Sequence, residues 1–146
     1  MDLLRPIEIL LVEDSPADIR LTQEALKENK LKINLNVVND GVEAMEYLRH
    51  EPIYADKPRP DLILLDLNMP RKDGREVLKE VKEDANLKTI PIVILTISKA
   101  EEDILLTYKQ HANCYIRKPL DLNQFIEVVK SIESFWFTIV TLPVQK

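Results

Sequence analysis

The sequence predicts an α/β fold in which a doubly wound, five-stranded parallel sheet is covered by helices on both faces. Short apolar runs alternate five times with longer segments whose apolar residues recur at helical spacing. Nearly continuous apolar runs are typical of strands that are buried on both faces of a parallel sheet. Right-handed crossovers place helices on both faces, and ligands are expected at the carboxyl ends of the strands.

The first strand and helix are predicted at the N-terminal end of the chain. Ile7 to Val12 is a short apolar run that ends in two acids, Glu13 and Asp14. Ser15 and Pro16 fit the N-cap and the first position of a helix. Apolar residues then follow at helical spacing before Asn29: Ala17, Leu21 and Ala25.

The next segment predicts a second strand, a second helix and a loop. Leu31 to Val38 alternates polar and apolar residues as a half-buried strand does. Asp40 and Gly41 then precede a helix with apolar positions at Val42, Met45 and Leu48. His50 to Pro60 contains three prolines, so we expect an exposed loop without regular structure.

The rest of the chain continues the alternation. Asp61 to Asp66 is a third apolar run, and the segment MPRKDG then leads into a helix with Val77, Leu78 and Val81 on its apolar face. Ile92 to Leu95 is a fourth run that ends at Thr96. The last three elements are a helix, a short strand and a helix, with apolar positions at Ile104, Leu105 and Tyr108, at Tyr115 and Ile116, and at Leu122, Phe125, Ile126, Val129 and Ile132.

Composition excludes several classes of protein. The 146 residues are 45% hydrophobic and 31% charged, which is typical of one globular domain. The only cysteine is Cys114 and the only histidines are His50 and His111, so an intramolecular disulfide and the common structural zinc sites are excluded. We read Cys114 as a packed side chain and His111 as a residue at a helix end. This cysteine usage fits a reducing cytoplasm.

Charge and glycine content exclude further functions. The net charge is -5, so we expect no direct DNA binding through bulk electrostatics. No apolar run approaches the roughly 18 residues of a membrane span, and early charged residues argue against a secretory signal. The two glycines, Gly41 and Gly74, are far apart, so a glycine-rich nucleotide loop cannot form.

Side chains suited to phosphoryl chemistry follow four of the predicted strands. Glu13 and Asp14 follow the first, Asp66 ends the third, Thr96 ends the fourth and Lys118 follows the fifth. Because these strand ends lie side by side in such a sheet, we expect the residues to share one pocket. Three carboxylates there would repel one another unless a cation binds, and oxygen ligands suit Mg²⁺. With the Lys118 ammonium and a hydroxyl, this makes a site for a phosphoryl group.

The motifs LLVEDSP, DLILLDLNMPRKDG, PIVILT and CYIRKPL resemble the receiver domain of two-component response regulators, from residue 7 to about 134. The resemblance implies a CheY-like fold with strand order 2-1-3-4-5. It also implies that Asp66 accepts a phosphoryl group from a phosphohistidine on a sensor histidine kinase. Such a domain catalyses only its own phosphorylation and dephosphorylation, and is not otherwise an enzyme.

The resemblance also implies the metal ligands. Asp14 and Asp66 would bind Mg²⁺ directly, and the backbone carbonyl of Asn68 would supply a third protein ligand. Glu13 would act through water. Mg²⁺ is therefore the one cofactor that we expect.

Four further residues take family roles by the same resemblance. Lys118 would pair with a phosphoryl oxygen, and the Lys118–Pro119 peptide would be cis, which an X-Pro bond tolerates. Thr96 and Tyr115 resemble the switch pair that responds to phosphorylation. A strand aromatic such as Tyr115 can also be simple packing.

Apolar residues continue beyond the receiver segment, from 135 to 146. We expect this C-terminal extension of the last helix to form a homodimer interface, although it could instead fold back on its own domain. The extension resembles that of the single-domain regulators that partner cyanobacterial phytochrome histidine kinases, which implies a light-sensing kinase. The expected interface residues are Phe135, Trp136, Ile139, Val128 and Ile132.

Two other functions compete with this interpretation. Haloacid-dehalogenase-like phosphatases also use an Asp nucleophile and Mg²⁺, but they need a second Asp where this chain has Asn68. A binding module that works without phosphorylation is the other.

Ile97 and Asn113 depart from the commonest receiver pattern, and the bulk of Ile97 predicts slower exchange with small donors or water. We expect a cytoplasmic protein that acts through an unidentified downstream protein.

Overall fold

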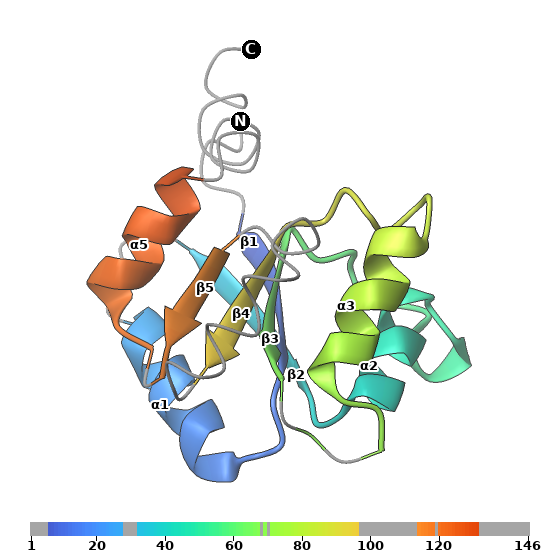
Figure 1. The fold of residues 1–146 in the computed structure, drawn as a ribbon, viewed down its shortest axis with the longest axis horizontal. Coiled ribbons are helices and arrows are strands. Elements are labelled where there is room, and N and C mark those ends of the chain that lie inside the picture. The colour runs from blue at the N-terminus through green and yellow to red at the C-terminus, as the bar shows by residue number, and fades with distance from the viewer. Residues whose placement is uncertain are drawn as a thin grey trace.

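A five-stranded parallel sheet in the order β2-β1-β3-β4-β5 forms the centre of the computed structural model (Figure 1). The structure describes residues 6–27, 32–67, 69, 71–96, 114–118 and 120–131. This architecture confirms the predicted fold class and strand order. The fourth predicted helix lies outside the described residues. The elements are β1 (Ile7–Val12), α1 (Pro16–Lys27), β2 (Ile33–Val38), α2 (Gly41–Leu48), the 3₁₀ turn η1 (Pro52–Tyr54), β3 (Leu62–Asp66), α3 (Gly74–Glu83), β4 (Ile92–Thr96), β5 (Cys114–Arg117) and α5 (Leu122–Ser131).

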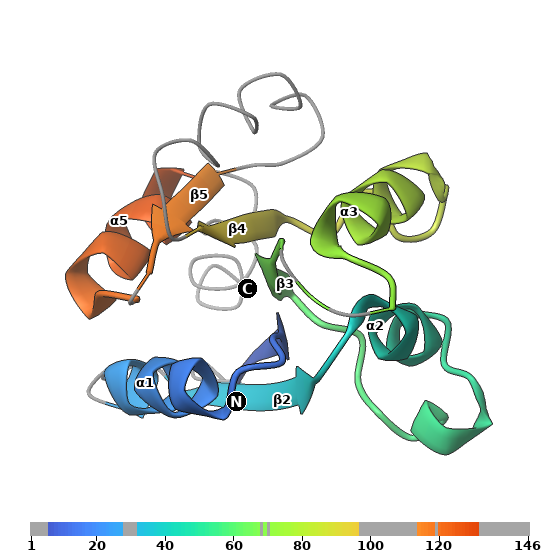
Figure 2. The ribbon, with the colours of Figure 1, turned by 60° about the horizontal axis from the view of Figure 1, so that its bottom comes forward.

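Two apolar layers pack on opposite faces of the sheet. Figure 2 shows α1 and α5 on one side and α2 and α3 on the other. Because side chains alternate along a strand, Leu10 and Val12 of β1 face α2 and α3, whereas Ile9 and Leu11 face α1 and α5. The central strands are buried on both faces, which explains their unbroken apolar sequences.

A side chain caps the start of each of the helices α1, α2 and α3, and the cap at Ser15 was predicted. Ser15 caps α1, since its Oγ accepts a hydrogen bond of 3.2 Å from the backbone N of Asp18. Asp40 caps α2 through a 2.9 Å bond from the backbone N of Glu43. Asp73 caps α3 in a reciprocal capping box with Glu76.

Among the helices that the structure describes, none has the length and apolar character needed to cross a membrane.

Two boundaries differ from the sequence-based expectation. β2 begins at Ile33 rather than at residue 31. β3 begins at Leu62, because the side chain of Asp61 instead accepts a 2.9 Å hydrogen bond from the backbone N of Glu8.

The prediction that His50 to Pro60 lacks regular structure was wrong in one respect, because the segment contains η1. Pro52 stands at the first position of this turn, where its fixed φ is favourable. The turn is also anchored, since the ring of Tyr54 packs 5.3 Å from that of Tyr47 on α2. Most of the segment is exposed, as predicted.

Candidate functional site

Three carboxylates converge where β1 and β3 end. Glu13 and Asp14 directly follow β1, and Asp66 is the last residue of β3. One oxygen from each side chain lies within 4.8 Å of the others. Glu13 and Asp66 are buried, whereas Asp14 is exposed. The structure thus brings together the three acids that the strand-end argument predicted; we call them the carboxylate cluster.

Lys118 follows β5 and points its ammonium into this cluster. Its Nζ lies 2.9 Å from Oε1 of Glu13, 3.3 Å from Oδ1 of Asp66 and 3.1 Å from Oδ2 of Asp18. Only 11% of the Lys118 side chain is exposed. The predicted meeting of Lys118 with the strand-end acids is therefore confirmed, and one positive charge faces several negative ones.

The electrostatics of the site follow from this crowding. Burial raises the pKa of Glu13 to about 7, against the effect of the neighbouring Lys118 ammonium and with a further contribution from the charge of Asp66. Burial alone would lower the pKa of Lys118. Its contact with Glu13 and the charge of Asp66 outweigh burial, so the pKa is raised and the ammonium stays protonated at neutral pH.

The donor set fits a divalent cation. Oε1 of Glu13 is fully buried, and the Lys118 ammonium at 2.9 Å leaves the negative charge of the other two acids uncompensated. Carboxylate oxygens with room for water are the ligands that Mg²⁺ prefers. One ammonium cannot neutralise the carboxylate cluster, so a bound cation would relieve the remaining repulsion. Glu13, Asp14 and Asp66 are the residues that could hold it; the predicted ligand Asn68 lies outside the described residues.

The backbone around Asp66 is held by a close approach to α3. The backbone N of Gly74 donates to the carbonyl of Leu67 at 2.9 Å. A Cβ atom at Gly74 would lie only 2.3 Å from the carbonyl oxygen of Asp66, a contact that no side chain tolerates. Gly74 therefore allows α3 to begin directly against the strand end that carries Asp66.

A polar link also joins the loop before α3 to the start of α2. Nε of Arg71, a residue with φ of 61°, lies 2.6 Å from Oδ2 of Asp40. The backbone N of Gly41 donates to the carbonyl of Lys72 at 2.9 Å. Burial alone would raise the pKa of Asp40, but the hydrogen bonds from Arg71 and from the first turn of α2 hold it below its ordinary value.

Several predicted site residues are only partly described or not described. The backbone of Thr96 ends β4, and Asp66 pairs with the adjacent Leu95, so the ends of β3 and β4 are level. The backbone of Tyr115 lies in β5. The side chains of Thr96, Tyr115 and Val128 lie outside the described part of the chain, as do all of Pro119, Ile97, Asn113, His111, Phe135, Trp136, Ile139 and Ile132, and the side chain of Cys114.

Sequence reasoning missed one member of the site, Asp18. This residue lies in the first turn of α1, where an acid is ordinarily explained by the helix dipole. A signal was nevertheless present, because Asp18 comes four residues after Asp14, in the first turn of the helix that follows β1.

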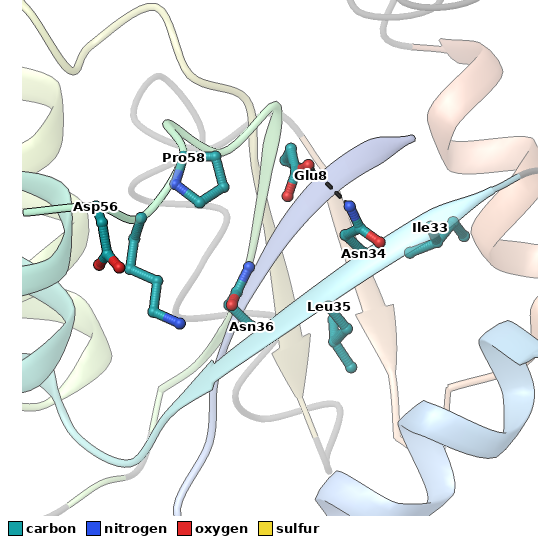
Figure 3. Close-up of a pocket in the computed structure, with 8 residues that line it drawn as sticks. Glu8, Ile33, Asn34, Leu35, Asn36, Asp56 and Pro58 are labelled. Atoms are coloured by element: carbon teal, nitrogen blue, oxygen red, sulfur yellow. Dashed lines mark hydrogen bonds between the residues drawn. The ribbon is translucent and has the colours of Figure 1, made fainter. Parts of the chain in front are cut away.

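A separate cavity of about 430 Å³ lies between β2 and residues 56–58 (Figure 3). One of its lining residues is Glu8, near the start of β1, which accepts a 3.0 Å hydrogen bond from Asn34. The carboxylate cluster follows the opposite end of the same strand. The cavity is therefore distinct from the predicted site.

Comparison with known proteins gives consistent matches. The family model described as response regulator receiver domain matches residues 9–130. Response regulator Rcp1 of Synechocystis sp. (strain ATCC 27184 / PCC 6803 / Kazusa) is 51% identical over 138 residues, which are 94% of this chain and 94% of the relative.

Solved structures extend the comparison. The phosphorylated cyanobacterial phytochrome response regulator RcpA is 54% identical, with a TM-score of 0.75 over 95% of this chain and 99% of that one. The Mn²⁺-bound form of response regulator Rcp1 is 51% identical, with a TM-score of 0.73 over 94% and 99% of the two chains. The matched residues 9–130 contain the carboxylate cluster and Lys118.

Proposed function

Because this chain belongs to the response regulator receiver family, we propose that it is a signalling protein switched by phosphorylation of Asp66. The observation that carries this proposal is the placement of a buried Asp66 carboxylate beside two further acids and 3.3 Å from the ammonium of Lys118. Asp66 is the nucleophile of this proposal, because it ends a central strand while two carboxylates and an ammonium surround it. Phosphorylation and dephosphorylation of Asp66 change only the chain itself, so we do not class the protein as an enzyme.

The residues of the carboxylate cluster would hold Mg²⁺. The bound ion would offset charge on the phosphoryl oxygens and so stabilise the transferring group. Asp14 and Asp66 are the direct ligands of this proposal, together with the backbone carbonyl of Asn68, and Glu13 acts through water.

The transfer step is an in-line displacement at phosphorus. An oxygen of Asp66 forms the new P–O bond while the P–N bond to the phosphohistidine breaks, and the imidazole nitrogen keeps the electron pair and is then protonated. Lys118 pairs with a phosphoryl oxygen, which its fixed positive charge allows at neutral pH. Most of the acceleration then comes from positioning and electrostatics. Hydrolysis of the acyl phosphate later restores the carboxylate.

The phosphodonor of this proposal is a sensor histidine kinase of the phytochrome type. Support comes from the name of RcpA, which is called a cyanobacterial phytochrome response regulator and is described in its phosphorylated form. The output passes to a downstream protein by contact. Thr96 and Tyr115, which end β4 and lie in β5, are the proposed switch residues.

The C-terminal residues 135–146 are the proposed dimerisation element. Their apolar sequence supports this role, with Phe135, Trp136 and Ile139 as the principal contacts. We expect the full chain to be a dimer by light scattering after size exclusion, and a Trp136→Lys variant to be a folded monomer. A monomeric wild-type protein at micromolar concentration would contradict this assignment.

The phosphoacceptor is tested by intact mass after incubation with Mg²⁺ and either a small phosphodonor or a phosphorylated sensor kinase. We expect one phosphoryl increment in the wild type, and none in Asp66→Ala or in the presence of EDTA. Circular dichroism of Asp66→Ala verifies that the variant is folded. An increment that persists in Asp66→Ala would move the phosphoacceptor elsewhere, and no increment from either donor would favour a phosphorylation-independent binding module.

A further inference from the structure

The ammonium of Lys118 is fully engaged before any phosphoryl group arrives. A lysine ammonium carries three N–H donors. The three carboxylates around Nζ lie at 2.9 Å (Glu13), 3.1 Å (Asp18) and 3.3 Å (Asp66). A phosphoryl oxygen on Asp66 therefore has to replace one of these partners of Lys118.

Asp18 differs from the other two partners in its surroundings. Its side chain is 33% exposed, whereas those of Glu13 and Asp66 are 1% and 6% exposed. If Glu13 lost its contact with Lys118, a buried charge would remain without a partner. Asp18 can instead turn into water at little cost. Asp18 is thus the partner that Lys118 exchanges most easily.

The backbone holds Asp18 in place for this role. Asp18 lies in the first turn of α1, and its backbone N donates to Oγ of Ser15, which caps the helix. Ser15 in turn donates its backbone N to Oε2 of Glu13 at 3.3 Å. The start of α1 is therefore tied to the carboxylate cluster, and the carboxylate of Asp18 reaches Lys118 from the helix side of the site.

We propose that Asp18 is a positioning residue that holds Lys118 in the unphosphorylated protein and competes with the incoming phosphoryl group for its ammonium. This inference rests on the proposed phosphorylation of Asp66 and adds a residue that sets its rate. Asp18 also adds negative charge beside the cation site. It therefore favours Mg²⁺ binding while it slows phosphoryl transfer.

The test is the Asp18→Asn variant, which keeps the shape and a hydrogen-bond acceptor but removes the charge. At saturating Mg²⁺, we expect phosphorylation by a small phosphodonor to be about fivefold faster than in the wild type, the effect of one partly exposed ion pair. We expect Mg²⁺ affinity, measured by calorimetry, to fall at least twofold. These opposite changes distinguish positioning from damage to the site, which would lower both quantities.

Two further variants make the test specific. Glu24→Gln removes an exposed acid elsewhere on α1 and should leave both quantities unchanged. In a Lys118→Ala background, Asp18→Asn should no longer accelerate phosphorylation, because its effect passes through Lys118. A phosphorylation rate of Asp18→Asn within twofold of the wild type, or an equal acceleration in the Lys118→Ala background, would overturn the inference while leaving Asp66 as the phosphoacceptor. A wild type that accepts no phosphoryl group would overturn the proposed function and this inference with it.

Discussion

Replacing Asp66 by Asn is expected to stabilise the protein in the absence of Mg²⁺. At the 4.8 Å limit that contains the carboxylate cluster, two unit charges repel by about 3.5 kcal/mol at an effective dielectric constant of about 20. Attraction between Asp66 and Lys118 at 3.3 Å opposes this with about 5 kcal/mol on the same scale.

The other partners of Lys118 decide the sign. Removing one member of a buried ion pair is usually destabilising, because the other charge is left unpaired. Here Lys118 keeps Glu13 at 2.9 Å and Asp18 at 3.1 Å, so its charge remains compensated. The variant is relieved of the repulsion between the acids. It also no longer buries the charge of Asp66, and burial of a charge costs several kcal/mol per ion in the wild type. We therefore expect a net stabilisation of about 1 to 3 kcal/mol.

Thermal unfolding at pH 8, where Glu13 is largely ionised, measures this difference. One kcal/mol corresponds to a shift of about 3 °C in Tm for a domain of this size. Mg²⁺ at one hundred times its Kd should stabilise the wild type by about 2.7 kcal/mol, and the Asn variant much less. The matched control is Asp56→Asn, which removes an exposed acid outside the cluster and should change stability by less than about 0.5 kcal/mol. A destabilised Asp66→Asn protein, or one that keeps the full response to Mg²⁺, would refute the reasoning.

Three other substitutions probe the surroundings of the site. Gly74→Ala should destabilise by about 1 to 3 kcal/mol in urea unfolding, because the new Cβ meets the fixed carbonyl oxygen of Asp66; wild-type stability would contradict the steric argument. Asp40→Asn keeps the helix cap but loses the ion pair with Arg71, for a cost of up to about 1 kcal/mol at neutral pH. Because the pKa of Asp40 is lowered on folding, that contribution is present above about pH 4 and disappears as the pH falls below it, so the Tm values should converge in acid; a constant difference would count against the ion pair. Ile97→Ala should speed autodephosphorylation by widening access for water, and equal rates in the two proteins would exclude this effect.

The fold and the centre of the site were predictable for one physical reason. Strands buried on both faces must be apolar throughout, so β1, β3 and β4 can be recognised in the sequence as apolar runs. The acids directly after such runs lie at the same edge of the sheet. Glu13, Asp14 and Asp66 follow from this rule alone. Comparison with known proteins confirms the resemblance to receiver domains and to phytochrome response regulators.

The features that escaped prediction depend on contacts between distant segments. The link between Asp40 and Arg71 joins residues 31 positions apart through a side chain on a left-handed backbone, for which a single sequence gives no signal. The bond between Asp18 and Lys118 spans 100 positions. Propensity also failed at η1, where proline appears as a breaker yet starts a short turn that α2 stabilises through Tyr47.

The carboxylate cluster places stability and function in opposition. Its three acids lie close together, and one lysine cannot neutralise them. Repulsion therefore remains in the folded protein, and a bound cation or the removal of one charge relieves it. That repulsion favours the binding of a divalent ion, because the ion relieves it. Asp18 adds to the same balance from α1, because it shares Lys118 and so leaves more negative charge for the ion to meet. Asp66→Asn and Asp18→Asn should therefore both weaken Mg²⁺ binding, but only Asp18→Asn leaves a phosphoacceptor on which faster transfer can be observed.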